Sequence, residues 1–211
     1  MVDDVTRLGL VHTVPALAAT FDDLVTDAAP ADVEAIHVVD PWLLRTALAS
    51  GVGPEVVDRL AAHVAHLRGR GVAGVLVTCS TLGEATEQVP EPDLPVLRVD
   101  QGMADRAIEL AGDGGRVAVL ATVASTLGPT ERLLHRSARQ AGRAVTVEAE
   151  LIDGTGTTEA AIRRWDGRVD VVVLAQASMA AAAGRAGSTA TPVLSSPELA
   201  TRRLVELVTR V

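Results

Sequence analysis

Short apolar segments alternate with helix-like segments along the whole chain, and this alternation limits the possible folds more than any other feature. The predicted strands are Arg7–Thr13, Val33–Val39, Val72–Thr78, Val96–Val99, Arg116–Thr122, Val145–Ile152, Val169–Ala175 and Val193–Ser195. The clearest helical patterns are Pro54–Arg70, Pro129–Ala141 and Glu198–Val211. Strands that alternate with helices predict an α/β fold with parallel sheets.

The sequence also contains an internal repeat. The segment VLVTCSTL around Cys79 resembles the segment VVLAQASM around Gln176. Pro95 and Pro192 begin a second matching pair with the same spacing, and a third pair, RLGLVHTV and RVAVLATV, begins the two halves. Because the matches keep their order, we expect two similar Rossmann-like halves related by pseudo-twofold symmetry, at residues 1–99 and 100–197.

The repeat also indicates where a ligand would bind. In open parallel sheets, ligands bind beyond the carboxyl ends of the strands. Thr13, Cys79, Thr122 and Gln176 all lie at such ends. We therefore expect the site to be a cleft between the two halves, which is a usual place for a small-molecule pocket.

Cys79 is the first candidate for chemistry. It follows a buried-type strand and precedes a predicted turn into a helix, where free N–H groups and the helix dipole favour a thiolate. The alternative is a small buried hydrophobic residue, which is the usual environment of a free cysteine. The strand-end position and the repeat favour the functional role.

Gln176 occupies the matching position in the second half. A carboxamide does not exchange protons near neutral pH, but it can orient a carboxylate or an amide through hydrogen bonds. Alternatively, it satisfies local backbone groups.

Several small hydroxyl residues lie at predicted strand ends and helix starts. Together they could bind an anion, whereas each one alone could simply cap a helix. The predicted substrate-binding residues are Gln176, Ala177 and these hydroxyl residues: Thr13, Ser80, Thr81, Thr122, Ser125, Thr126 and Ser178.

His12 is the second predicted catalytic residue. It stands at the end of the first strand, where an imidazole can act as acid or base or bind a carboxylate. Its counterpart in the repeat is Ala121, so the histidine belongs to one half only. His37 and Asp40, after the second strand, are weaker candidates.

Two other patterns predict no site. His63 and His66 lie on one predicted helix without a further ligand, which indicates a solvated face, and no metal is expected. The segment Asp153–Thr158 is rich in glycine but lacks the lysine of a phosphate-binding loop. We interpret this segment as a turn.

Composition excludes several classes of protein. The net charge is −8 and no basic run is present, which argues against nucleic acid as a partner. A single cysteine excludes an internal disulfide and fits a reducing compartment. Residues 1–4 lack the pattern of a signal peptide, and no apolar run approaches the roughly 20 residues that span a bilayer. We expect a cytoplasmic protein with no membrane contact.

The motifs around Cys79 and Gln176, the two first strands that end in threonine, and the duplication together resemble the aspartate/glutamate racemase superfamily. The stretch Gly9–Pro15 is similar to a racemase-like subgroup of it. The resemblance implies that the C-terminal helix, 198–211, packs back on the first half. It also implies cofactor-independent proton transfer next to a carboxylate or carbonyl group, small substrates of that kind, and assembly as a homodimer.

This chain differs from the family at the second-half cysteine, which is Gln176 here. Two-thiol racemisation is therefore excluded, and three classes remain open. The first is an isomerase or racemase that uses Cys79 with a partner such as His12. The second is a lyase, similar to arylmalonate decarboxylase, in which Cys79 donates a proton. The third is an inactive homologue that binds small carboxylates.

Overall fold

The computed structural model describes residues 5–30, 32–89, 91–153 and 156–209. The chain divides into two compact units, which are called unit 1 and unit 2 below. Unit 1 comprises Met1–Val99 and Pro197–Val211, and unit 2 comprises Asp100–Ser196.

Unit 1 is built on a four-stranded parallel sheet with the strand order β2-β1-β3-β4. Its elements are β1 (Thr6–His12), α1 (Leu17–Ala28), β2 (Val33–Val39), α2 (Pro41–Ser50), α3 (Pro54–Gly69), β3 (Val72–Val77), the 3₁₀ helix η1 (Ser80–Leu82), α4 (Gly83–Thr86), β4 (Val96–Arg98) and α9 (Ser196–Thr209). The central strands are almost fully buried, which explains their continuous Val and Leu runs.

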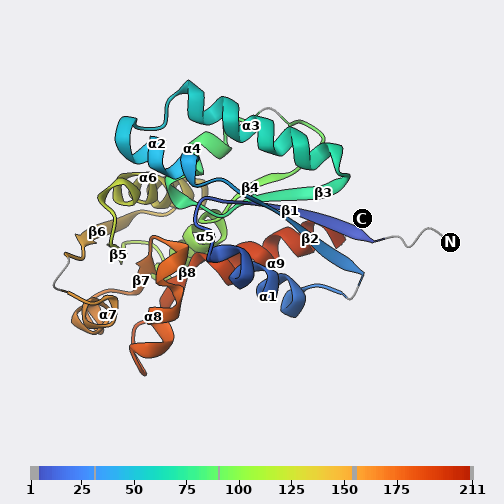
Figure 1. Cartoon of the computed structure of the whole chain (residues 1–211). Coiled ribbons are helices and arrows are strands. Elements are labelled where there is room, and N and C mark those ends of the chain that lie inside the picture. The colour runs from blue at the N-terminus through green and yellow to red at the C-terminus, as the bar shows by residue number, and fades with distance from the viewer. Residues whose placement is uncertain (1–4, 31, 90, 154–155, 210–211) are drawn as a thin grey trace. The chain divides into compact units, whose positions relative to one another are not determined.

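Helices cover both faces of this sheet (Figure 1). A Cβ added to Gly9 of β1 would lie 3.0 Å from Leu67 of α3, so α3 packs closely on one face. A Cβ added to Gly74 of β3 would lie 2.9 Å from Leu204 of α9. The C-terminal helix therefore packs on the sheet of unit 1, although it follows unit 2 in the sequence.

Unit 2 repeats this topology with the strand order β6-β5-β7-β8, again entirely parallel. Its elements are α5 (Gln101–Ala111), β5 (Gly115–Ala121), α6 (Ala124–Gln140), β6 (Val145–Leu151), α7 (Thr158–Trp165), β7 (Val171–Leu174), the 3₁₀ helix η2 (Ala177–Met179), α8 (Ala180–Arg185) and β8 (Val193–Ser195). The short helix after β7 matches the one after β3 in type and length.

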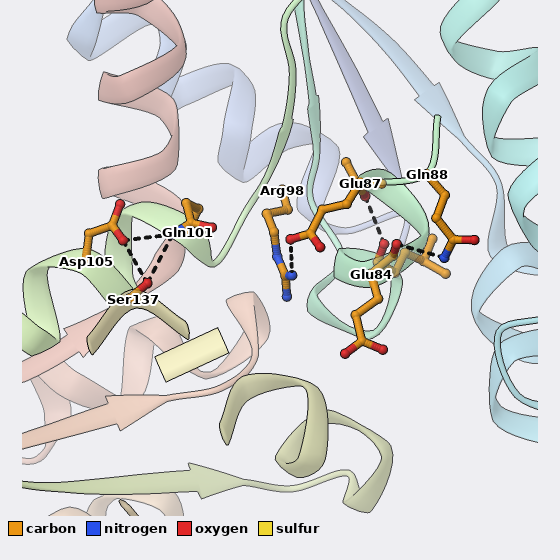
Figure 2. Close-up of polar contacts among 9 residues, drawn as sticks. Glu84, Glu87, Gln88, Arg98, Gln101, Asp105 and Ser137 are labelled. Carbon is orange, nitrogen blue, oxygen red and sulfur yellow. Dashed lines mark hydrogen bonds and ion pairs between the residues drawn. The ribbon is translucent and has the colours of Figure 1, made fainter. Parts of the chain in front are cut away.

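Helices α5 and α6 of unit 2 are joined by a polar cluster (Figure 2). Ser137 of α6 donates to Asp105 of α5 over 2.8 Å, and Gln101 donates to the same carboxylate over 2.7 Å. On the other face, Ile162 of α7 packs in a cluster with Leu120 and Leu174 of the sheet.

The predicted fold class is confirmed. Every predicted strand is present, with ends shifted by at most two residues, and the strand order of the first sheet recurs in the second. One predicted boundary is wrong, because α6 begins at Ala124 and contains Pro129 in its interior. The prediction placed this proline in a first helical turn, where its missing N–H costs nothing. In α6 its missing N–H instead leaves out one hydrogen bond of the helix.

Parts of three predictions lie outside the described residues. They are the interpretation of residues 1–4, the centre of the predicted turn at 154–155, and the last two residues of the C-terminal helix. Across the described chain, none of the helices is long and apolar enough to cross a membrane.

Leu204 should anchor α9 to the sheet. Its side chain is fully buried, whereas Leu207 on the same helix is 46% exposed. We expect Leu204→Ala to lower the free energy of unfolding by about 2–5 kcal/mol, and Leu207→Ala to change it by less than about 0.5 kcal/mol. Urea unfolding of both variants checks this, and equal effects would contradict the packing described.

Candidate functional site

Cys79 lies immediately after β3, where the extended backbone turns into η1. The residue is partly exposed and packs against a hydrophobic cluster that includes Leu43 and Leu82. The turn is held by a hydrogen bond of 3.0 Å from the Leu82 N–H to the Cys79 carbonyl. The predicted position of the thiol at the carboxyl end of a buried strand is therefore observed.

Pairing of β1 with β3 brings the predicted residue Thr13 to this thiol. The Thr78 N–H donates to the Val11 carbonyl over 3.0 Å, so the two strands end side by side. Sγ of Cys79 accepts hydrogen bonds from the hydroxyls of Thr13 and Thr81 and from the N–H groups of Thr81 and Leu82. Thr13, Ser80 and Thr81 are all buried, so this set of donors is fixed by packing.

Burial has the larger effect on the thiol. Removal from water raises the pKa of Cys79, and the hydrogen bonds from Thr13, Leu82 and Thr81 offset only part of that rise. The N–H groups of the turn do lower the pKa of Cys79, but burial outweighs them, so the expectation of a net preference for the thiolate is wrong. The helical segment after the cysteine is short and buried, so its N–H groups do not compensate for the lost solvent. The resting group near neutral pH is the protonated thiol.

Arg98 packs against the turn after Cys79 and stabilises it. This role was not predicted from the sequence. Its side chain is 4% exposed and forms an ion pair of 2.6 Å with Glu87, which Figure 2 shows. The guanidinium packs against Gly83, where an added Cβ would lie only 2.2 Å from its terminal nitrogen. Gly83 is therefore needed for close approach of this arginine.

His12 is fully buried and lies in a chain of hydrogen bonds. Its Nδ1 is 2.9 Å from the Thr78 hydroxyl oxygen, and its Nε2 is 2.9 Å from Nδ1 of His37. Nε2 of His37 is in turn 3.3 Å from the carboxylate of Asp22 on α1. The two imidazole rings are stacked, with centroids 5.1 Å apart.

The Thr78 hydroxyl fixes the direction of this chain. It donates to the Val11 carbonyl over 3.1 Å, so its oxygen accepts from the protonated Nδ1 of His12. Nε2 of His12 then accepts from His37.

The buried position of His12 keeps it neutral near pH 7. Burial, and then the nearby His37, lower the pKa of His12 to about 4. Both ring nitrogens are engaged within the protein, so neither is offered to a ligand. The role of His12 as an acid or base stays a prediction, and in this structure its ring nitrogens contact Thr78 and His37.

Asp40 caps α2 and binds two side chains of α3. It accepts hydrogen bonds from the Trp42 N–H at 3.1 Å, from Arg59 at 2.5 Å and from His63 at 2.6 Å. Burial opposes ionisation, but the Arg59 and His63 bonds hold the pKa of Asp40 below its usual value. The interpretation of His63 as a solvated residue is therefore wrong, whereas His66 is exposed.

In unit 2, Gln176 lies after β7 as Cys79 lies after β3. Its Oε1 accepts three hydrogen bonds: from the Thr122 N–H at 2.7 Å, the Thr122 hydroxyl at 3.1 Å and the Val123 N–H at 3.1 Å. The threonine after the first strand thus donates to the repeat-related residue in both units.

The other predicted residues of unit 2 differ in availability. Thr126 is buried and donates to the Val123 carbonyl over 2.8 Å, so its hydroxyl serves the helix start. Oγ of Ser125 is buried and has no partner among the described residues. Ala177 is buried in η2, and Ser178 is exposed beside it.

The structure therefore brings the predicted residues together within each unit: Thr13, Cys79, Ser80 and Thr81 in unit 1, and Thr122, Gln176, Ala177 and Ser178 in unit 2. The cleft between the halves stays a prediction. Within the described ranges, no three His, Cys, Asp or Glu side chains gather as a metal site.

Comparison with known proteins identifies the fold. No family model matches the chain, and no curated protein sequence matches it significantly. Solved structures match over nearly its full length. Allantoin racemase from Klebsiella pneumoniae has 20% identity and a TM-score of 0.66, over 97% of this chain and 88% of that one. Aspartate racemase from Picrophilus torridus has 14% identity and a TM-score of 0.71, over 97% and 94%.

Glutamate racemase from Aquifex pyrophilus also matches, with 16% identity and a TM-score of 0.64, over 96% of this chain and 84% of that one. The fold is thus the one seen in aspartate, glutamate and allantoin racemase structures, which confirms the fold that the sequence resemblance implied.

The low pKa of His12 should make stability fall in acid. The unfolded state takes up a proton near pH 6.5, but folded His12 does so only near 4. Its contribution to stability is therefore present above pH 6.5 and is lost as the pH falls toward 4. Between pH 7 and 5 this loss is about 2 kcal/mol. Urea unfolding of His12→Gln should show a free energy of unfolding that falls by about 2 kcal/mol less than that of the wild type between pH 7 and 5. An equal fall in both proteins would contradict the low pKa of His12.

Loss of the Thr13 hydroxyl should raise the pKa of Cys79 further, because that hydroxyl lowers it in the folded protein. We expect Thr13→Val to move the pH midpoint of Cys79 alkylation by iodoacetamide upward and to slow alkylation at neutral pH. Thr26→Val, at an exposed position of α1, is the matched control and should leave the midpoint unchanged. A midpoint that does not move in Thr13→Val argues against the contact.

Proposed function

We propose that this protein is a racemase- or isomerase-like enzyme that transfers a proton at a carbon next to a carboxylate or carbonyl group. Cys79 is the proton-transfer residue, and the substrate is a small carboxylate or carbonyl compound. The observation that carries the proposal is the environment of Sγ, which is packed at a strand end and surrounded by donors from Thr13 and Thr81. The fold shared with racemase structures supports it.

The donors suit a thiol that gives up its proton during the reaction. When Sγ releases its proton to a carbanion, the negative charge remains on sulfur. The hydroxyls of Thr13 and Thr81 and the N–H of Thr81 then stabilise that thiolate without rearrangement. The reverse step returns the proton from carbon to sulfur.

A single thiol limits the reaction that Cys79 can perform. The chain has one cysteine, and the amide of Gln176 does not titrate near neutral pH. Proton removal and return by Cys79 therefore occur on one face of the substrate. This favours a shift of a proton between neighbouring atoms over inversion of a stereocentre by two thiols.

The raised pKa of Cys79 supports a lyase as the second candidate. A protonated resting thiol is ready to donate to a carbanion that forms when carbon dioxide leaves a malonate-type substrate. The thiolate that results regains its proton from water. Product protonation would then be confined to one face.

Deuterium incorporation tests both reactions. The wild-type protein is incubated in heavy water with aspartate, glutamate, allantoin and an arylmalonate, and deuterium at the reacting carbon is followed by NMR. We expect incorporation with at least one compound and its loss in Cys79→Ala, while Thr26→Val retains it.

Incorporation that survives in Cys79→Ala would exclude Cys79 as the proton-transfer residue. Binding of a carboxylate without any exchange would indicate the inactive homologue instead.

A further inference from the structure

Gln176 is held in one orientation by its own unit. Its Oε1 accepts from two backbone N–H groups, of Thr122 and Val123, and from the Thr122 hydroxyl. Backbone N–H groups only donate, so the oxygen and not the nitrogen of the amide must face them. All acceptor capacity that this side chain directs toward the chain is thereby used.

The NH₂ group of Gln176 is the part that remains free. The hydrogen bonds that Gln176 forms with described residues all go to its oxygen, and the residue is partly exposed. Thr122 and Ser178 beside it are exposed, so water and small solutes reach this part of unit 2. The carboxyl end of β7 therefore presents two N–H donors on a side chain that is already fixed.

A fixed donor group discriminates between ligands by polarity. A carboxylate or carbonyl oxygen accepts from the amide without any cost of ordering the side chain, whereas an ammonium group meets only the positive end of the N–H dipoles. Amide rotation could not accommodate an ammonium cheaply, because the NH₂ group would then face the N–H groups of Thr122 and Val123.

We propose that Gln176 makes the carboxyl end of β7 a binding site for a hydrogen-bond acceptor, a carboxylate or carbonyl oxygen, and excludes an ammonium group from it. The inference deepens the proposed function and rests on it, because it names the chemical group of the substrate that Gln176 contacts. The alternative is a purely structural role, in which the NH₂ group binds only water.

Gln176→Glu separates the two roles, since the side chains have the same shape. One carboxylate oxygen can keep the three donors, in stronger charge-assisted bonds, while the other replaces the NH₂ donors by an acceptor. A structural role predicts a stable variant that binds solutes like the wild type. A binding role predicts a stable variant that has lost affinity for carboxylates. Gln140→Glu, at an exposed position of α6, controls for the added charge.

The experiment uses the full-length protein labelled with ¹⁵N. Acetate and methylammonium are titrated while the side-chain amide signals are recorded, and the pair missing from Gln176→Glu identifies Gln176. We expect acetate to shift this pair with saturation and methylammonium to leave it in place. Acetate affinity, followed at the Thr122 and Val123 backbone signals, should fall about tenfold or more in Gln176→Glu, and stay within about twofold of wild type in Gln140→Glu.

The proposal is overturned if acetate leaves the Gln176 signals unmoved, if methylammonium shifts them equally, or if Gln176→Glu binds acetate as the wild type does. The same titration in Cys79→Ala keeps this outcome distinct from that of the proposed function. Suppose that acetate binds to Cys79→Ala but the wild type shows no deuterium exchange. That result would support the binding site at Gln176 and count against proton transfer by Cys79.

Discussion

In each unit the first strand pairs in parallel with the third. This pairing places the residues that follow the two strands side by side at the carboxyl ends of the sheet, although they are far apart in the sequence. In unit 1 the pairing of β1 with β3 brings Thr13 to Cys79. In unit 2 the pairing of β5 with β7 brings Thr122 to Gln176. Each threonine donates to the residue after the third strand, so one backbone constraint generates both local arrangements. The chemistry then depends on which side chain stands there.

Cysteine and glutamine give these two positions opposite properties. The thiol can release and take up a proton. Burial raises its pKa, and the hydrogen bonds from its donors offset part of that rise. The carboxamide does not titrate near neutral pH, and its oxygen is occupied by the chain itself. Unit 1 thus carries the titratable group, and unit 2 carries a fixed donor. This asymmetry agrees with the proposal of one-thiol chemistry.

Much of the fold could be predicted from the sequence, because buried parallel strands appear as Val and Leu runs and the repeat gave their order. The nearness of Thr13 to Cys79 also followed from their strand-end positions. The pKa of Cys79 could not be predicted, since it is set by a balance between burial and hydrogen bonds that no local pattern encodes. The orientation of Gln176 depends on the N–H of Thr122, 54 residues earlier in the sequence. The stacking of His12 with His37 likewise needs the register of β1 with β2.

The protonation state of Cys79 is the central physical claim, and a direct titration of the thiol tests it most simply. Thiolate absorbance in the ultraviolet is measured against pH for the wild-type protein, and the curve of Cys79→Ala is subtracted. We expect the cysteine step to lie at higher pH than the step of an unperturbed cysteine thiol. A step near or below neutral pH would contradict this expectation, because Cys79 would then rest as a thiolate.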